Sequence, residues 1–545
     1  MTLAQLPADI LLELAATLES PADVLSLSIS SKALFPSIAP ALYRKVVLRS
    51  VQQCTATLSM LKRRTDIARH VRELAISPPQ SRFKFSESKE CSSAVATIAF
   101  SRCLDSLSKF CWLDDFLHEE MWLALRICCP RLRYLTTSVG AFFPSSSHLF
   151  SFDNLHGFSL LLGPGFYENN TESLLDEGWP PSKKLWDMLF MRCPNLEELS
   201  IEGFSAFPAD ARCVSEGRWP RLHKLSLGDL SVDASATLPS AKSPFVTFLE
   251  AHPELQSLSL SRHNLDPVQL QTLDQDALKL SSFSGTLSQL QALSHSYSTL
   301  KSLSFRDPLW SRDPTILTIA NILQQLPALT DLSIVFTLHS PYDSSSILRA
   351  LVSSCPHITS LTLACLRKSS FQLDALAKGL SAFRRLRTLN LTLVSSGDLT
   401  LRAAGVRFAR ANPRLREFAI AFVHQSYPHA IPRRPFYPLP RMKKATARFG
   451  VVSDGFGLPA AVRVRESWTT VWPWGLGARR VVKKYTMEVR QTGAGSSEAL
   501  TKRNTGGWRG IARLLMESSP AGEELRMFVF CSFLCAFAVV FVVKG

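Results

Sequence analysis

The chain has 545 residues, a formal net charge of +16 and 46% hydrophobic residues, so it is long enough for two or three domains or one long repeat array. This composition excludes a largely disordered chain. No secretory signal is expected, because the N-terminus lacks a charged start, an apolar run and a small-residue cleavage site. The twelve cysteines show no compact spacing, which predicts free, buried thiols in a reducing compartment.

The first fifty residues predict three short helices. Leu6, Ile10 and Leu14 recur every four residues and form an apolar stripe. Pro7 suits the start of the first helix, and Ser20 is a candidate N-cap of the second. A leucine-rich segment this short buries little surface alone, which favours an interaction module over an independent fold.

This segment, about the first tenth of the chain, resembles an F-box. The matching residues are Leu6-Pro7, Asp9-Ile10-Leu11, Leu14, Pro21-x-Asp23-x-Leu25, Ser31-Lys32 and Leu42-Tyr43-x-x-Val46. The resemblance implies docking on the Skp-type adaptor of a cullin-RING ubiquitin ligase. The implied adaptor contacts are Leu6, Pro7, Ile10, Leu11, Leu14, Leu25 and Leu34. The alternative is an ordinary helical cap whose leucines belong to the core of a larger domain.

The middle of the chain repeats the pattern Leu-x-x-Leu-x-Leu after an apolar, helix-like run. The first anchors of the last five copies follow one another at steps of 29, 29, 28 and 29 residues: Leu300, Leu329, Ile358, Leu386 and Leu415. This period lies at the long end of the leucine-rich-repeat range. Alternating leucines suit one face of a short strand, and units of this kind must stack to bury it. An all-helical solenoid is the rival architecture.

The array resembles the long, helix-containing leucine-rich repeats often found behind an F-box. It departs from that family because the Asn or Cys after the strand is absent or displaced, as at Asn264 and Cys365. Spacing before Leu196 is irregular, and Ser145 to Lys184 is predicted to be an insertion loop.

We therefore predict an α/β solenoid: a short N-terminal three-helix F-box, a leucine-rich-repeat horseshoe and a β-rich C-terminal cap. The predicted units are an F-box-like helical module (1–48), a linker with irregular first repeats (49–110), the repeat array (111–425), a basic, proline- and aromatic-rich cap (426–515) and a tail (516–545).

The polar positions within the strand motifs are expected to line the concave face of the horseshoe. We predict a substrate-binding surface rich in small hydroxyls, since open faces of rigid scaffolds often carry function. Its candidate residues are Ser302, Ser304, Asp331, Ser333, Ser360, Thr362, Thr388, Asn390 and Glu417. Taken singly, each is equally explained as a solvent-facing strand position.

The C-terminal part is strongly basic, with seventeen Lys and Arg against four Asp and Glu between Ile431 and Leu515. Alternation and Gly turns predict short strands that close the solenoid. A solvated basic face is expected, with acidic substrates or an anionic membrane as further partners. The uncharged segment 527–543 is either a membrane-spanning tail anchor or a terminal element packed on the cap.

No HExxH, GxSxG, Walker-type or paired CxxC motif occurs, so neither enzyme activity nor a metal or cofactor is expected. The predicted function is the substrate-recognition subunit of an SCF-type ubiquitin ligase. Its expected partners are a Skp-type adaptor, a cullin through that adaptor and an unknown protein substrate, with no specific nucleic acid. The alternatives are a membrane-tethered leucine-rich-repeat scaffold and a basic nucleic-acid-binding repeat protein. The expected location is cytoplasmic, nuclear or both, with membrane anchoring through the tail as a further option.

Overall fold

The computed structural model describes most of the chain between residues 5 and 488. The described ranges are 5–18, 21–77, 85–114, 116–139, 147–162, 180–203, 209–232, 242–262, 264–275, 277–310, 315–338, 343–366, 373–394, 400–423, 443–453, 459–471 and 478–488. The proline-rich linker at 427–441 and the tail with its apolar segment 527–543 lie outside them. Within these ranges, no helix combines the length and the apolar character needed to cross a bilayer.

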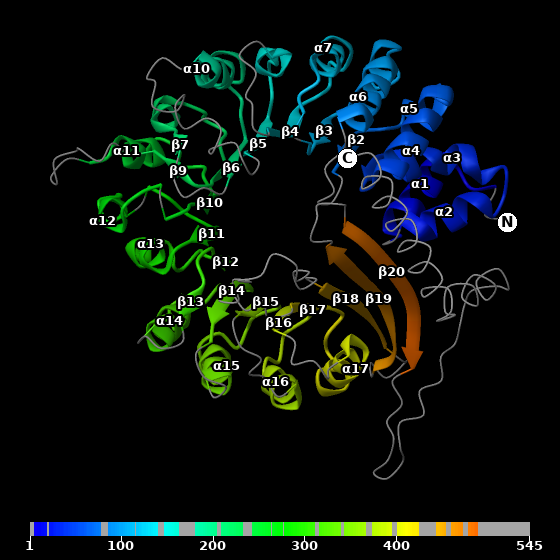
Figure 1. The fold of residues 1–545 in the computed structure, drawn as a ribbon. Coiled ribbons are helices and arrows are strands. Elements are labelled where there is room, and N and C mark those ends of the chain that lie inside the picture. Colours follow the sequence, from blue (N-terminus) through cyan, green and yellow to red (C-terminus); the bar gives the residue numbers. More distant parts are fainter. Residues whose placement is uncertain are drawn as a thin grey trace, which may run out of the picture.

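One curved sheet forms the inner layer of a horseshoe, and helices form the outer layer (Figure 1). The strands of this sheet are β1 (Lys45–Leu48), β2 (Glu73–Ile76), β3 (Lys109–Trp112), β4 (Tyr134–Val139), β5 (Gly157–Leu162), β6 (Glu198–Gly203), β8 (Lys224–Leu227), β10 (Ser257–Ser259), β11 (Ser282–Gly285), β12 (Ser302–Phe305), β13 (Leu309–Trp310), β14 (Asp331–Thr337), β15 (Ser360–Leu366), β16 (Thr388–Val394), β17 (Glu417–Val423), β18 (Lys443–Ser453), β19 (Pro459–Val471) and β20 (Ala478–Glu488). A separate small pair joins β7 (Ala209–Asp210) to β9 (Leu230–Ser231).

The helices differ widely in length along the arc. They are α1 (Ala8–Thr17), α2 (Pro21–Ile29), α3 (Leu34–Tyr43), α4 (Val51–Arg63), α5 (Thr65–Ala68), α6 (Phe85–Phe100), α7 (Glu119–Cys128), α10 (Pro180–Asp187), α11 (Pro244–Glu250), α12 (Pro267–Leu270), α13 (Leu287–Ala292), α14 (Thr315–Gln324), α15 (Asp343–Ser354), α16 (Leu373–Leu380) and α17 (Leu401–Ala411), with shorter turns η2 (His148–Ser151), η3 (Met188–Arg192), η4 (Arg212–Glu216) and η5 (Ser294–Ser296).

The repeat leucines hold neighbouring strands in parallel register. Leu303 faces Leu332, which faces Leu361 and then Leu389 on successive strands. All four are buried between the sheet and the outer helices. Burial of this shared apolar row is what stacks the units. The predicted α/β solenoid is confirmed, and the all-helical alternative is wrong.

The parallel sheet begins earlier, and contains more units, than the leucine pattern indicates. It starts at Lys45, where β1 pairs with β2. The insertion loop predicted for Ser145 to Lys184 is wrong where it covers η2, β5 and the start of α10, because β5 pairs along its whole length with β4 and β6. In β5 and β11 the buried position that leucine takes in other strands is held by Phe158 and Phe283. The Leu-x-x-Leu-x-Leu pattern therefore does not detect these two strands.

Asn264 satisfies backbone groups of the preceding repeat although it is displaced in the sequence pattern. Its Nδ2 donates to the carbonyl oxygens of Gly228 (3.0 Å) and Leu230 (2.8 Å). Its Oδ1 accepts a hydrogen bond from the Ser261 backbone amide. The side chain is only 1% exposed, and the Gly228 carbonyl also accepts from the Leu230 backbone amide at 2.8 Å. The Asn264 amide therefore adds further partners to a set of buried backbone groups.

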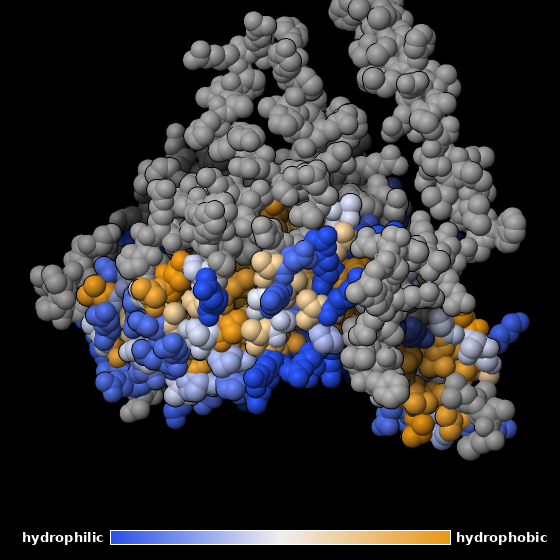
Figure 2. All heavy atoms as spheres, turned by 90° about the horizontal axis from the view of Figure 1, so that it is seen from below, coloured by the Kyte–Doolittle hydropathy of each residue, from blue (hydrophilic) through white to orange (hydrophobic). Residues whose placement is uncertain are grey.

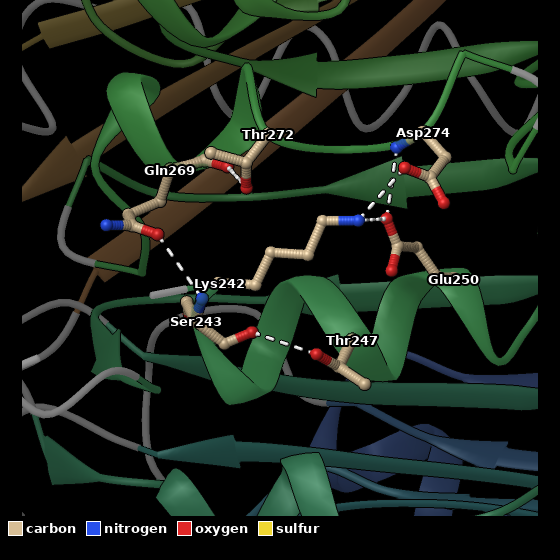
Figure 3. Close-up of polar contacts among 7 residues, drawn as sticks. All are labelled: Lys242, Ser243, Thr247, Glu250, Gln269, Thr272 and Asp274. Carbon is tan, nitrogen blue, oxygen red and sulfur yellow. Dashed lines mark hydrogen bonds and ion pairs between the residues drawn. The ribbon is translucent and has the colours of Figure 1, made fainter. Parts of the chain in front are cut away.

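A surface network joins the ends of α11 and α12 (Figure 3). Lys242 Nζ donates to Glu250 Oε1 at 2.6 Å and to Asp274 Oδ1 at 3.0 Å. The Asp274 backbone amide donates to the same Glu250 oxygen at 3.0 Å. Gln269 Oε1 accepts from the Ser243 amide at 3.3 Å. Together these contacts tie two successive outer helices to each other.

The N-terminal helices α1, α2 and α3 enclose a small core of their own. Its buried residues are Leu11, Ala15, Val24, Leu34 and Ile38. The main core is separate from this one and begins at Val46 in β1. On α3, Phe35 and Tyr43 pack against the main core. The third helix therefore connects the module to the end of the sheet.

At the other end, β18 adds to β17 in antiparallel register, and β19 and β20 follow as antiparallel neighbours (Figure 1). We call these three strands the β-extension. Strands are present here as predicted, but they are long rather than short. Phe449 of β18 stacks on Phe418 of β17, with centroids 4.6 Å apart. The Phe449 ring also lies against Gly405 of α17, so the last helix covers the junction.

Replacing Gly405 by alanine is expected to destabilise this junction. A Cβ atom at Gly405 would clash with Cε1 of Phe449, and that ring is held by its stack on Phe418. Overpacking of this kind costs about 1–3 kcal/mol, which outweighs the roughly 1 kcal/mol that alanine gains in helix propensity. Urea denaturation of Gly405→Ala against wild type measures the difference in unfolding free energy.

Gly379→Ala in α16 is the matched control. Its Cβ would meet Leu348 Cδ1 at 3.2 Å, at the end of a flexible side chain, so it should be neutral or stabilising. Equal stability of Gly405→Ala and wild type would contradict the packing described for Phe449.

Candidate functional site

The concave face of the sheet carries a continuous row of hydroxyl side chains. The row places one Ser or Thr from each successive strand in register with the next: Thr136, Ser159, Ser200, Ser226, Ser259, Ser284, Ser304, Ser333 and Thr362. Each alternates with a buried apolar residue, so the hydroxyls point away from the helices and into the hollow of the horseshoe. We call this set the hydroxyl row.

The nine residues predicted for substrate binding all lie on this face. Ser304, Ser333, Thr362 and Asn390 belong to the hydroxyl row or continue it. The others form the adjacent register row: Ser302, Asp331, Ser360, Thr388 and Glu417. All nine are at least partly exposed. Their exposure on this face does not by itself show binding, so substrate binding stays a prediction.

Sequence reasoning missed several members of the hydroxyl row, on β4, β5, β6, β8 and β11. They are Thr136, Ser159, Ser200, Ser226 and Ser284, which are in register with the predicted residues. For Ser159, Ser200 and Ser226 the available signal was a small hydroxyl residue directly between two apolar residues. It was obscured where Phe283 takes the place of a leucine beside Ser284.

Arg306, which follows β12, crosses the middle of the concave face. Its guanidinium forms an ion pair with Glu202 at 3.1 Å and donates to Ser259 Oγ at 2.7 Å and to the Leu227 carbonyl at 3.0 Å. Glu202 also accepts a hydrogen bond from Ser226. The arginine is thus satisfied by groups from three other strands, and its charge is balanced by a local carboxylate.

A pocket of about 650 Å³ lies where the repeats meet the β-extension. It is lined by Thr388, Asn390, Glu417, Phe418, Ala419, Arg448, Phe449, Gly450, Arg463, Val464, Arg465, Tyr485 and Thr486. The hydroxyl row leads into it: Thr362 faces Asn390, Asn390 faces Ala419, and Ala419 faces Arg448 of β18. The chemistry of the concave face therefore changes from neutral hydroxyls to guanidinium groups within three strands.

A buried polar contact between β19 and β20 lies at one wall of this pocket. The Tyr485 hydroxyl donates to Glu466, whose side chain is buried. Burial raises the pKa of Tyr485, and the hydrogen bond to Glu466 raises it further. The phenol is therefore neutral at physiological pH and fixes β20 against β19 at the wall of the pocket.

The seven predicted adaptor contacts are divided between the buried core of the helical module and its surface. Leu11 and Leu34 are each 2% exposed and belong to the core of the helical module. Ile10 (39% exposed), Leu14 (39%) and Leu25 (45%) are on its surface, together with Ile29 (71%), which was not predicted. Pro7 is exposed and Leu6 is half-buried. Figure 2 shows hydrophobic residues gathered on the block at the right of the view, where the N-terminal helices of Figure 1 lie.

In the described part of the chain, no group of three or more His, Cys, Asp or Glu side chains is arranged to hold a metal ion. The described cysteines are free thiols, and most are buried. Burial raises the pKa of Cys129 and Cys355 to about 12, so these thiols remain protonated and inert.

No protein-family model and no curated protein matches this chain. Among solved structures, it is similar to one described as the complex of Rad7 and Elc1 in yeast, with a TM-score of 0.40 and 14% identity over 71% of this chain and 97% of the other. It is also similar to the leucine-rich repeat-containing protein LegL7 from Legionella pneumophila, with a TM-score of 0.24 and 14% identity over 70% of this chain and 90% of the other.

Proposed function

We propose that the chain is the substrate-recognition subunit of an SCF-type cullin-RING ubiquitin ligase. The N-terminal helices dock a Skp-type adaptor, and through it a cullin, while the concave sheet face receives a protein substrate. The chain does no bond chemistry; it raises the effective concentration of substrate near the ubiquitin-charged enzyme. It acts in the cytoplasm, the nucleus or both.

The observation that carries the proposal is the apolar surface of α1 and α2. Ile10, Leu14, Leu25 and Ile29 stay at least 39% exposed although the module already has its own filled core. We call these four residues the apolar patch. Exposed apolar clusters of this kind mark protein contact sites, because covering them removes apolar surface from water.

The arrangement of the two ends supports the same proposal. The helical module joins the sheet through α3, beside β1, at the opposite end of the sheet from the β-extension. The apolar patch and the pocket share no residue, so different surfaces of the chain are proposed for adaptor and substrate. A receptor needs this separation, since adaptor and substrate must bind at the same time.

Substitution of the apolar patch should abolish adaptor binding without unfolding the chain. We expect full-length Ile10→Asp and Leu14→Asp to lose co-purification with a Skp-type adaptor. A charge placed against an apolar partner surface must be desolvated without compensation, and because both positions are exposed the fold should persist. Pull-down of the adaptor, with circular dichroism of each variant, measures both effects.

The matched control is Leu317→Asp on α14, an apolar residue that is 70% exposed and distant from the module. It should bind like wild type. Failure of wild type to bind, where a known F-box protein succeeds, would reject the ligase role. It would favour the scaffold alternative, whose membrane segment 527–543 lies outside the described residues.

A further inference from the structure

Three arginines of the β-extension converge on the pocket at the end of the hydroxyl row. Arg448 of β18 and Arg463 and Arg465 of β19 are exposed and line the same hollow. None of the three forms an ion pair with any carboxylate in the described ranges. Glu417 is the one acidic residue in the lining. The pocket therefore carries an excess of positive charge.

The register forces two of these arginines against each other. Arg448 faces Arg465 directly across the β18–β19 ladder, and Arg463 lies two residues from Arg465 on the same face. Like charges directly opposite on neighbouring strands are destabilising. Arg306, by contrast, has Glu202 as its counterion on the same concave face. An anion bound between Arg448 and Arg465 would relieve the repulsion.

Gly450 leaves room for that anion. It stands in register between Glu417 and Arg463, and a Cβ atom built on it would meet nothing within 4 Å. The missing side chain opens the floor of the pocket beside the arginines. Thr388 and Asn390 on the repeat side add groups that hydrogen-bond to an oxyanion or to a peptide backbone.

We infer that this pocket binds a phosphorylated serine or threonine of a polypeptide segment. Guanidinium groups bind phosphate oxygens in bidentate fashion, and a phosphate carries about −1.5 to −2 charges at pH 7, which matches several arginines better than one carboxylate does. A volume of about 650 Å³ accommodates a phosphorylated residue with its neighbours rather than phosphate alone. As a statement of substrate class, the inference rests on the proposed receptor function.

The test measures binding to the full chain in the absence of adaptor. The probes are fluorescent peptide pools with a central phosphoserine or phosphothreonine and mixed neighbours, with unphosphorylated pools and a single-stranded oligonucleotide for comparison. We expect wild type to prefer the phosphorylated pools, and inorganic phosphate to compete and to raise the melting temperature. Arg448→Gln and Arg465→Gln should each weaken binding roughly tenfold or more, since each removes a charge-assisted hydrogen bond.

Two further variants test the geometry. Gly450→Ile should fill the floor and weaken binding while leaving the melting temperature at or above wild type, because the space is open and the residue suits a strand. Glu417→Gln should strengthen binding by removing the opposing charge. Arg131→Gln, at an exposed arginine outside the pocket, should change nothing.

Equal binding of phosphorylated and unphosphorylated pools overturns the inference, as does binding that survives in the combined Arg448→Gln and Arg465→Gln variant. Arginine-dependent binding of the oligonucleotide in preference to the peptides also overturns it, in favour of a nucleic-acid surface. The combined variant should still co-purify with the adaptor. Phosphopeptide binding by a chain that fails to bind adaptor would leave the pocket established and the ligase role rejected.

Discussion

Trp219→Ala is expected to destabilise the chain by about 3–5 kcal/mol, the cost of truncating a large buried aromatic side chain. Trp219 is 1% exposed and connects consecutive units. Its Nε1 donates to the Leu189 carbonyl at 3.1 Å, and its backbone amide donates to His252 Nε2 at 3.1 Å. Its ring packs edge-on to Phe248, with centroids 6.2 Å apart. The truncation leaves a cavity and an unpaired buried carbonyl, and the midpoint of urea unfolding measures the combined loss.

Trp219→Phe is the control that separates these two contributions. It keeps most of the ring volume and loses the hydrogen bond to Leu189, so it should cost about 1–2 kcal/mol. An alanine variant no less stable than the phenylalanine variant would mean that Trp219 does not hold the neighbouring units together. A loss of 3–5 kcal/mol is a large part of the 5–15 kcal/mol typical of folded domains.

Asn264→Ala should cost about 2 kcal/mol or more. The change removes the donors to the carbonyls of Gly228 and Leu230 and the acceptor for the Ser261 amide. The Gly228 carbonyl keeps the Leu230 amide as a donor at 2.8 Å. Each of the other two buried groups left without the asparagine costs about 1–3 kcal/mol. Because the affected groups belong to two successive units, the loss should appear as a lower midpoint for the whole array. Thermal and urea unfolding both report it.

Asn390→Ala is the matched control for that experiment. Asn390 is exposed, and its Nδ2 donates to Thr362 Oγ1 at 3.3 Å on the open sheet face. Water replaces this bond after truncation, so the change should stay within about 0.5 kcal/mol of wild type. Similar losses of stability at Asn390 and Asn264 would show that the buried hydrogen bonds of Asn264 add no more stability than an exposed one.

The architecture could be predicted wherever leucine fills the buried strand positions. Leu332, Leu361 and Leu389 recur at a nearly constant step and face one another in the sheet. The same structural positions hold Phe158 and Phe283 in units that the pattern did not reveal. Burial selects for apolar volume rather than for leucine, so a signature based on one residue type misses equivalent units.

The candidate sites were predictable in part for a related reason. Strand alternation identifies residues that share a face, and this placed Ser302 through Glu417 on the concave side. It does not give the register between strands: Arg448 and Arg465 face each other only because β18 and β19 run antiparallel with that register. In the helical module, a spacing of four residues marks a stripe but does not tell which of Ile10 and Leu11 faces inward; burial assigns Leu11 to the core.

The division of the hydrophobic interior has a dynamic consequence. One uninterrupted core runs from Val46 to Met487, whereas the N-terminal helices share a core of five buried residues. The free energy of opening a segment follows the apolar contacts that it breaks, so α1 and α2 can open while the horseshoe stays intact. Their backbone amides should therefore exchange hydrogen with solvent long before those of β14 to β17. A protein that covers the apolar patch would suppress this opening, and part of its binding free energy would be used to order the helices.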